Sequence, residues 1–575
     1  MRSNRAQESD GLMRGLYDVI VVGSGAGGGT SAYVLTQAGL KVLMLEAGRE
    51  YDPIRETPMF QVPSEAPLHG ASTPDKPGGY YDATVDGGHE VPGEPYAIAE
   101  DSPVKFRWWR ARMLGGRTNH WGRLSLRFGP YDFKPRSRDG LGVDWPISYE
   151  DLAPWYDKVE RFIGVAGANE GLENTPVSPP GVLLPPFPFR AREYFLQKGL
   201  QSMGIPVAAA RLAILTQAHN GRPPCLYATP CLRGCSIAAN FQSTTMLIPQ
   251  ARATGNLNVR TNALVYQVDL GQGGRASGVS FVDRITGTHH SVRGKSVVLA
   301  ASTAETARIL LNSNTSAFPN GVANESGQVG RNLTDTLFVH TVGQFPALEK
   351  LGPRNDDGAS IFHMYVPWWG YQQQARKQLD FPRGYHIEPH GKYTMPEMDE
   401  MSRYADDCQA SHGVAFKDEM RRKYGSYISF SGRGEMIPNE RTFVDLHPTL
   451  TDKWGIPAPR FHWQWGESEL RQAAHQHCTY LQIIDRLGGR FVPEQSMGID
   501  SPLPTGVHET GTARMGFSDK DSVVNSYGQS WSVRNLFIMD GSVLASHPRS
   551  PTLTIIALAW RNSDYLVDQA RKMSL

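Results

Sequence analysis

The sequence predicts an α/β protein built around a Rossmann-type dinucleotide-binding unit, and three features of its first fifty residues support this. The β-branched run Tyr17–Val22 is typical of a buried parallel strand. A G-x-G-x-x-G motif follows at once, with its glycines at Gly23, Gly25 and Gly28. Residues 30–38 then have the pattern of a helix, and residues 41–45 that of a second strand. Strand, glycine turn, helix and strand in this order indicate a unit that holds the pyrophosphate of a dinucleotide.

Each part of this unit has a physical role in binding. The first glycine permits a tight turn, the second lets a pyrophosphate approach the backbone, and the third lets helix and strand pack closely. The helix N-terminus offers unpaired N–H groups and the positive end of its dipole to the phosphates. Glu46 ends the second strand and can accept hydrogen bonds from ribose hydroxyls; with no arginine beside it, a 2′-phosphate is disfavoured. We therefore predict cofactor contacts at Gly23, Ser24, Gly25, Ala26, Gly28 and Glu46. A glycine-rich turn without a ligand is the alternative, and the unit alone does not choose between FAD and NAD.

Length and composition exclude several classes of protein. The chain has 575 residues, enough for roughly two to four folding units. Its 58 basic and 57 acidic residues leave a net charge of +1, so there is no electrostatic case for binding nucleic acid. No run of about 18 apolar residues is present, so no membrane span is expected. Residues 1–16 form a polar N-terminal tail without the apolar core of a secretory signal. By its own sequence we expect the chain to stay in the cytoplasm, and to reach the periplasm only if exported with a partner.

Four further motifs carry a family resemblance. They are Leu114–Gly122 (LGGRTNHWG), His508–Gly516 (HETGTARMG), Asn535–Ser542 (NLFIMDGS) and Ser550–Ala559 (SPTLTIIALA). With the N-terminal unit they resemble the glucose–methanol–choline (GMC) flavoprotein oxidoreductases. Within that family the chain looks most similar to the catalytic subunits of bacterial FAD-dependent glucoside 3-dehydrogenases and to the pyranose and C-glycoside oxidases. The resemblance implies that the cofactor is FAD.

The resemblance also implies how the chain is divided. A discontinuous Rossmann-type FAD-binding domain would comprise residues 17–139, 240–335 and 500–575. A substrate-binding domain of α+β type, with an antiparallel sheet, would comprise residues 140–239 and 336–499.

Two residues are the candidates for catalysis. Oxidation of an alcohol removes a proton from oxygen and a hydride from carbon, so it needs a base as well as a flavin. His508 stands where the family has its catalytic histidine, which implies that it is the general base; a histidine of the core is the alternative. The family's second position usually holds histidine or asparagine, but here it is Ser550. A serine can hydrogen-bond the substrate hydroxyl but is a poor base, so we expect it to orient the alcohol less well.

Further flavin contacts are implied by the resemblance at Gly116, Asn119, His120, Val265, Asp540, Gly541, Pro551 and Thr552. His120 matches the frame in which pyranose oxidases attach their flavin covalently; a histidine packed beside the ring without a bond is the alternative. Pro551 is expected at the first position of the last helix, with Ser550 as its N-cap. The N-terminus of that helix would face the flavin pyrimidine, where negative charge develops on reduction.

Three cysteines lie within eleven residues, at Cys225, Cys231 and Cys235. Thiolates in a short loop rich in glycine and proline suit a soft metal or an iron–sulfur cluster. Some sugar dehydrogenases of the family carry such a cluster near this point of the chain and pass electrons through it to a small subunit and a cytochrome. Zinc, three free thiols, and one disulfide with a thiol left over remain open as alternatives.

The predicted function is FAD-dependent oxidation of a secondary alcohol of a sugar or glycoside to a ketone, with C3 of a glucoside as the expected position. An oxidase of pyranoses or C-glycosides that uses oxygen is the closest alternative. A non-redox lyase, or a flavin-binding homologue that has lost activity, is the alternative of another class, because fold does not imply chemistry.

Overall fold

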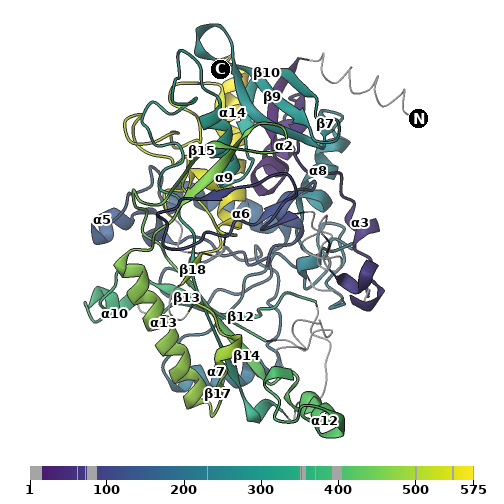
Figure 1. The fold of residues 1–575 in the computed structure, drawn as a ribbon, viewed down its shortest axis with the longest axis vertical. Coiled ribbons are helices and arrows are strands. Elements are labelled where there is room, and N and C mark those ends of the chain that lie inside the picture. The colour runs from purple at the N-terminus through teal and green to yellow at the C-terminus, as the bar shows by residue number, and fades with distance from the viewer. Residues whose placement is uncertain are drawn as a thin grey trace.

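We describe the fold from a computed structural model of the chain. The described residues are 16–60, 63–71, 73, 87–228, 231–349, 351, 358–369, 371–391, 405–498, 502–504, 506–546 and 549–573. The molecule is elongated, with one sheet and its helices in the upper half of Figure 1 and a second sheet in the lower half. None of the helices in these ranges is long and apolar enough to cross a membrane.

The first sheet has the strand order β7-β2-β1-β10-β9-β8, and β19 pairs with β10. Its strands are β1 (Tyr17–Val22), β2 (Val42–Leu45), β7 (Leu257–Arg260), β8 (Ala263–Leu270), β9 (Ala276–Asp283), β10 (His289–Leu299) and β19 (Leu536–Ile538). The strands β7, β2, β1, β10 and β19 run parallel, whereas β8 and β9 add antiparallel pairs. Strands from the beginning, middle and end of the chain therefore meet in one sheet, which confirms the predicted discontinuous Rossmann-type unit.

The helix after the glycine turn, α2 (Ala26–Gln37), begins earlier than the predicted start at residue 30. Glycine is a poor helix former, so the sequence pattern places the start too late. The glycines occupy the first turn because a Cβ at Gly27 would lie 1.7 Å from the carbonyl oxygen of Met539, which follows β19. No side chain caps the helix at Gly25, so its first N–H groups are not satisfied by a cap.

Helices surround the first sheet, some packed on its strands and others on neighbouring helices. The longer ones are α6 (Tyr149–Ile163), α8 (Ser243–Ala253), α9 (Thr303–Asn312) and α14 (Thr552–Arg571). Helix α2 packs between α8 and α14, and α14 also packs on α6. This burial on several sides explains why α2 is apolar around most of its circumference, with Thr30, Ala32 and Leu35 all fully buried.

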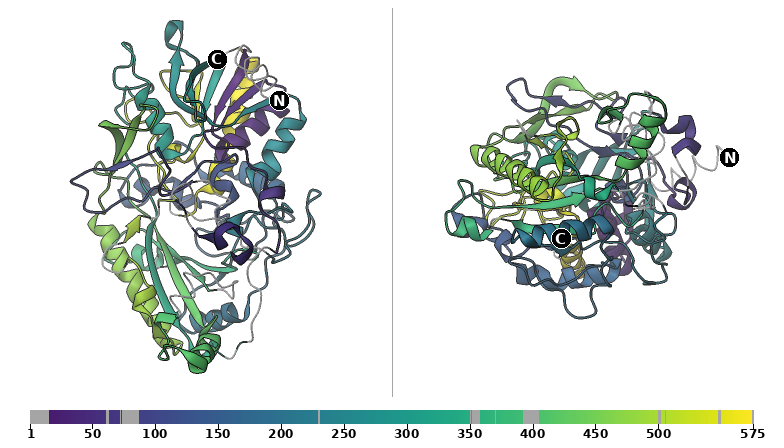
Figure 2. Two further views of the ribbon diagram at one scale, coloured as in Figure 1. Left: turned by 45° about the vertical axis from the view of Figure 1, so that its right-hand side comes forward. Right: turned by 90° about the horizontal axis from the view of Figure 1, so that it is seen from below.

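The second sheet is antiparallel, with the strand order β17-β11-β14-β13-β12-β6, and β18 pairs with β11. Its strands are β6 (Ala208–Ala209), β11 (Leu337–Gln344), β12 (Met364–Trp369), β13 (Tyr385–His390), β14 (Tyr427–Gly434), β17 (Arg490–Phe491) and β18 (Leu503–Pro504). Helix α13 (Glu467–Arg486) lies along this sheet, as the turned view in Figure 2 shows. The antiparallel sheet was predicted; the exact boundaries between two domains stay a prediction.

The two faces of the second sheet differ in character. Gly432 and Gly434 of β14 leave room for Gln472, Gln476 and Tyr480 of α13 on one face. The opposite face is polar, and its central residues follow from the register of β11, β14 and β13. They are Phe338, Arg433 and His386 in one row and His340, Ser431 and Glu388 in the next. We call these six residues, together with His390, the polar face.

Smaller elements complete the fold. Three strands, β4 (Ala97–Ile98), β15 (Phe443–Thr451) and β16 (Pro457–His462), form one sheet, and β3 (Gly87–Gly88) pairs with β5 (Arg110–Ala111). The remaining α-helices of the described residues are α3 (Pro53–Glu56), α4 (Pro130–Phe133), α5 (Pro135–Asp139), α7 (Ala191–Ser202), α10 (Tyr371–Ala375) and α12 (Gly413–Lys423). One continuous hydrophobic core contains residues of both large sheets, such as Val297 of β10 and Ile387 of β13.

We expect Gly27→Ala to destabilise the fold by at least about 3 kcal/mol, the upper end of the usual range for overpacking, because the added methyl meets a backbone carbonyl that cannot move independently. Urea unfolding followed by circular dichroism measures this. Gly25→Ala is the matched control, because a Cβ at Gly25 meets no atom within 4 Å. Equal midpoints for the two variants would contradict the packing argument.

Candidate active site

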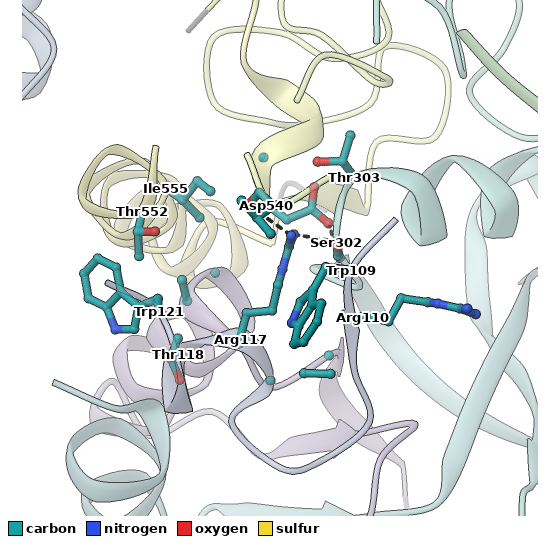
Figure 3. A pocket seen from close by; sticks show the side chains of 18 of the residues that line it. Trp109, Arg110, Arg117, Thr118, Trp121, Ser302, Thr303, Asp540, Thr552 and Ile555 are labelled. Atoms are coloured by element: carbon teal, nitrogen blue, oxygen red, sulfur yellow. Dashed lines mark hydrogen bonds between the residues drawn. The ribbon is translucent and has the colours of Figure 1, made fainter. Parts of the chain in front are cut away.

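One cavity of about 570 Å³ extends from the glycine turn before α2 to the polar face of the second sheet. Most of the predicted site residues line it: Gly23, Ser24, Gly25, Ala26, Glu46, Gly116, His120, Val265, His508, Asp540, Gly541, Ser550, Pro551 and Thr552. Figure 3 shows that side chains from several distant segments, among them Trp109, Arg117 and Thr552, surround the same space. The fold therefore brings both the predicted cofactor contacts and the predicted catalytic residues to one cavity.

Two of the predicted contacts, Gly28 and Asn119, do not line the cavity, and their contact with the cofactor stays a prediction. Gly28 lies inside the turn, where a Cβ would be 2.0 Å from the carbonyl oxygen of Gly23, so its role is close packing. Asn119 is buried behind the Gly-Gly loop. Its amide donates to the carbonyl oxygen of Leu114 over 2.8 Å and accepts from the Thr244 hydroxyl over 2.8 Å, so it braces the loop.

The glycine turn has the shape that a pyrophosphate requires. Gly23 adopts φ +95°, which an L side chain rarely adopts, and a Cβ there would lie 2.3 Å from the Ala300 carbonyl oxygen. Gly25 is different, because a Cβ built on it points into open space within the cavity. Gly116 lies beside it, because a Cβ built on Gly116 would be 3.5 Å from the Cα of Gly25. The open space at Gly25 and the uncapped N–H groups of α2 together fit the phosphates of FAD.

Glu46 lines the cavity from the end of β2 and is held by hydrogen bonds. Its carboxylate accepts from the Ser24 amide over 3.1 Å, from the Ser24 hydroxyl over 2.5 Å and from the Gly48 amide over 2.7 Å. Burial raises the pKa of Glu46, and these hydrogen bonds and the nearby Arg112 act in the opposite direction. Its contact with a ribose stays a prediction.

Arginines near Glu46 were not expected from the local sequence, yet Arg110 and Arg112 line the same cavity. The guanidinium of Arg112 is buried between two carboxylates, with Nε 2.7 Å from Glu94 and a terminal nitrogen 2.5 Å from Glu305. These two partners neutralise its charge, so Arg112 is not a spare cation for a 2′-phosphate. Only the tertiary structure brings these distant segments together.

The segment before α14 places a buried carboxylate at the cavity. Asp540 accepts from the Ser302 amide over 3.1 Å and from the Thr306 and Ser542 hydroxyls over 2.5 Å each. Burial raises the pKa of Asp540, which these hydrogen bonds oppose. Ser302 itself has φ +85°, a strained conformation for a residue other than glycine. The strained backbone of Ser302 thus directs its amide toward Asp540.

The start of α14 differs by one residue from the prediction. The helix begins at Thr552, and Pro551 is its N-cap, with its carbonyl oxygen accepting the first helical bond from Ile555 over 2.9 Å. Ser550 therefore lies outside the helix, where its side chain lines the cavity instead of capping a turn. The helix N-terminus still opens on the cavity, and that it faces the flavin pyrimidine stays a prediction.

His120 lines the cavity and is held by an indole. The Trp109 indole N–H donates to its Nε2 over 2.8 Å. Burial lowers the pKa of His120 to about 3, with Arg123 and Arg117 acting in the same direction, so the ring is neutral. Because Nε2 accepts a hydrogen bond, the proton of the neutral ring lies on Nδ1. Covalent attachment of the flavin to this ring, and packing beside the flavin without a bond, both stay predictions.

His508 and Ser550 line the cavity together. His508 is half-buried, and its Nδ1 lies 3.0 Å from the hydroxyl oxygen of Thr336, which directly precedes β11. Ser550 is 6% exposed. The neighbour of His508 in the motif, Glu509, forms a two-point ion pair with Arg117, at 2.8 and 2.9 Å. Since Arg117 follows Gly116, this pair joins the Gly-Gly loop to the histidine motif across the cavity, and Figure 3 shows Arg117 reaching Ser302 as well.

Sequence reasoning missed Glu388 and Arg433, which line the cavity from the polar face. The Arg433 Nε donates to Glu388 Oε2 over 3.3 Å, and His386 Nε2 lies 3.1 Å from Glu388 Oε1. Burial alone would raise the pKa of Glu388, but Arg433, His386 and His508 hold it at about 2. The signal in the sequence was the alternation of polar residues in His386–His390 and Ser429–Arg433, which is typical of strands with one polar face.

The three clustered cysteines lie beside this cavity but do not line it. Cys225, Cys231 and Cys235 line a separate small cavity of about 10 Å³, and all three are free thiols. Burial raises the pKa of Cys225 to about 12, and the neighbouring Cys231 adds to this. Among the described residues, no three histidine, cysteine or acidic side chains are arranged to hold a single metal ion. The iron–sulfur cluster stays a prediction.

Comparison with known proteins defines the class. The N-terminal family model of the GMC oxidoreductases matches residues 17–338, and the C-terminal model matches residues 438–559. The 2-methyl-1,2-propanediol dehydrogenase of Mycolicibacterium austroafricanum is 30% identical, over 96% of this chain and 95% of that protein. The fructose dehydrogenase large subunit of Gluconobacter japonicus is 27% identical, over 96% and 98%. The crystal structure of pyridoxine 4-oxidase from Mesorbium loti has the same fold, with a TM-score of 0.61 at 16% identity, covering 96% of this chain and 99% of that one.

The chain belongs to the GMC oxidoreductase family. It is a flavoprotein with FAD as its cofactor, and an enzyme that acts on CH–OH groups. The cavity fits this cofactor, because the open turn at Gly25 and the N-terminus of α2 suit its phosphates and the N-terminus of α14 suits the flavin.

We expect Gly25→Val to fold but to bind little FAD, because its branched side chain would fill the space that the pyrophosphate needs. The flavin-to-protein absorbance ratio of purified protein measures binding, and circular dichroism checks the fold. A variant that kept the full flavin content of the wild type would refute this use of the turn.

Proposed function

We propose that the protein oxidises a secondary hydroxyl of a sugar or glycoside to a ketone, with C3 of a glucoside as the expected position. The main support is that His508 and Ser550 line the same cavity as the glycine turn, together with Glu388 and Arg433 of the polar face. A base, a hydroxyl donor and a polar wall therefore adjoin the site of the cofactor.

The residues divide the chemistry between them. FAD bound in this cavity supplies the acceptor for the hydride from carbon. His508 takes the hydroxyl proton: when its Nδ1–H donates to Thr336, Nε2 is the nitrogen that receives the proton. The Ser550 hydroxyl donates a hydrogen bond to the substrate oxygen. The ion pair of Arg117 with Glu509 holds the motif that carries His508.

Two charged residues of the polar face support a substrate with several hydroxyl groups. Glu388 and Arg433 line the cavity, and largely buried polar groups need hydrogen-bond partners, so this wall favours a ligand that offers several. The names of the two relatives indicate different substrates: one acts on fructose and the other on a small branched diol. A short diol is therefore the second candidate substrate for the same site.

We also propose an electron outlet at the three cysteines, in the form of an iron–sulfur cluster. Leu232 lines the cofactor cavity while the adjacent Cys231 lines the small thiol cavity, so the cysteine loop lies next to the cofactor site. The buried guanidinium of Arg123 donates to the carbonyl oxygens of Cys231, over 2.5 Å, and Asn119, over 2.7 Å. In the part of the chain that the structure describes, no carboxylate pairs with Arg123, and an anionic thiolate cluster would balance its charge.

Through this outlet, electrons would pass to two protein partners, a small subunit and a cytochrome. The name of the fructose dehydrogenase large subunit implies an assembly in that relative. Expressed alone, the chain would then stay in the cytoplasm and reach the periplasm only when exported with its partner. If the cluster is absent, an oxidase that passes its electrons to oxygen is the better-supported function.

Anaerobic mixing with substrates tests the main proposal. We expect glucosides to bleach the flavin absorbance and yield a keto sugar that mass spectrometry detects; fructose and 2-methyl-1,2-propanediol belong in the same panel. A protein with full flavin that no alcohol reduces would contradict the proposal and favour the lyase or the inactive homologue.

His508→Ala should keep its flavin but be reduced by substrate about 10²–10⁴-fold more slowly, the usual loss when a general base is removed. Stopped-flow absorbance measures the rate. The matched control is His289→Ala, which removes an exposed histidine outside the cavity. Reduction of the His508 variant at the wild-type rate would refute its role as base.

Iron and acid-labile sulfide should both be present in protein purified without air, because three thiolates at one cavity would carry the cluster. Cys231→Ser should lose iron yet keep flavin reduction by substrate, whereas Cys478→Ser, at an exposed position, should change neither. Absence of both elements from the wild type would refute the cluster.

A further inference from the structure

Arg433 lies at the centre of the polar face. It occupies the middle strand β14, between Phe338 of β11 and His386 of β13. Its side chain is 15% exposed and lines the cavity that also contains His508 and Ser550. A cation that is so largely removed from solvent needs charge compensation and hydrogen-bond acceptors.

The protein holds this guanidinium from two sides. The Nε atom donates to Glu388 Oε2 over 3.3 Å, and the guanidinium carbon stands 4.6 Å from the centre of the Phe338 ring. Glu388 is fixed in turn by His386 over 3.1 Å. Burial would raise the pKa of Glu388, but Arg433 leads the interactions that hold it at about 2, so this partner stays anionic throughout the working range of pH. The orientation of Arg433 is therefore set before any substrate binds.

The terminal nitrogens of Arg433 are left for a ligand. Its only side-chain hydrogen bond within the described part of the chain is the one from Nε. The four N–H bonds of the two terminal nitrogens thus have no partner there, in a residue that lines the cavity. A buried arginine whose terminal guanidinium nitrogens are unused is suited to bind an oxygen atom that carries negative charge.

Within the described residues, the second catalytic position offers the reacting alcohol a neutral hydroxyl group. Ser550 occupies the position beside α14, and its neutral hydroxyl gives a weaker hydrogen bond than a charged donor. We propose that Arg433 supplies a charged donor: its terminal N–H bonds donate to the substrate's reacting oxygen and stabilise the negative charge that develops there. This inference rests on the proposed function of the cavity.

Oxidation of the alcohol conserves atoms, protons and electrons. The O–H bond of the carbinol breaks and its proton goes to His508, the C–H bond breaks and its electron pair leaves as hydride to the oxidised flavin, and the C=O bond of the ketone forms. The substrate is oxidised by two electrons and the cofactor is reduced by two. Arg433 neither gains nor loses a proton; it lowers the energy of the alkoxide-like oxygen while the proton departs.

The test compares Arg433→Ala and Arg433→Lys with the wild type, each with FAD bound. We expect the limiting rate of anaerobic flavin reduction by substrate to fall about 10²–10³-fold in the alanine variant, as on removal of other oxyanion donors, and less in the lysine variant. Added guanidinium chloride should restore part of the rate to the alanine variant only. Flavin content and thermal midpoint check that both variants fold.

Arg331→Ala is the matched control, because this arginine also stacks on a phenylalanine, 4.1 Å from the Phe443 ring centre, but lies outside the cavity. If removing Arg433 alone prevents folding by leaving Glu388 unpaired, the double variant Arg433→Ala/Glu388→Gln removes both charges and should show the same loss and the same rescue. A rate within twofold of wild type, or a loss that guanidinium does not restore, would overturn the proposal.

A binding measurement is independent of turnover. Acetate serves as the oxyanion probe, and its perturbation of the flavin absorption spectrum gives a dissociation constant. We expect this constant to rise at least tenfold in Arg433→Ala and to be unchanged in Arg331→Ala; equal constants for wild type and Arg433→Ala would overturn the inference. If no alcohol reduces the wild-type flavin, the proposed function fails, and acetate binding still decides whether Arg433 is an oxyanion site.

Discussion

Close contact between backbones at the start of α2 is the constraint on which the cofactor site depends. At Gly23, Gly27 and Gly28 an added Cβ would overlap a backbone carbonyl oxygen. The turn and the helix can therefore pack against the ends of strands β10 and β19 only because these positions carry no side chain. Gly25, between them, is the glycine whose missing side chain leaves space open. The same short segment therefore fixes the packing of the first sheet and the place of the phosphates.

The second principle of the site is that its buried charges are arranged in pairs across chain segments that are far apart in sequence. Arg117 with Glu509 and Arg433 with Glu388 each join different elements at one cavity. Such pairs contribute little net stability, because desolvation offsets their attraction, but breaking one leaves an uncompensated buried charge. Their value here is orientation: each holds a motif or a side chain that faces the reacting groups.

Arg433 and Arg123 depart from this pattern in different ways. Arg433 has a carboxylate on one side and, among the described residues, unused donors on the other, which suits a polar ligand in the cavity. Arg123 donates to backbone carbonyls beside the cysteine loop and, within the described ranges, has no acidic partner. The two arginines mark the two directions in which the chemistry would extend from the flavin, toward the substrate and toward an electron acceptor.

The sequence by itself determined the N-terminal βαβ unit and the family, and most of the site residues that it predicted line the cavity, because turn glycines, a buried strand and motif residues are local features with fixed spacing. The sequence placed the start of α2 too late, because the low helix propensity of glycine hid a first turn that packing requires. It placed the cap of α14 one residue too early, because Ser550 before Pro551 resembles an N-cap, whereas in the structure Ser550 lines the cavity. Only the tertiary structure revealed Arg112 beside Glu46, the pair of Arg117 with Glu509, and Glu388 and Arg433 on the polar face. Each of these contacts joins segments far apart in sequence, and no local pattern shows which segments meet. The contacts exist only once the fold has assembled and desolvation favours pairing of buried charges.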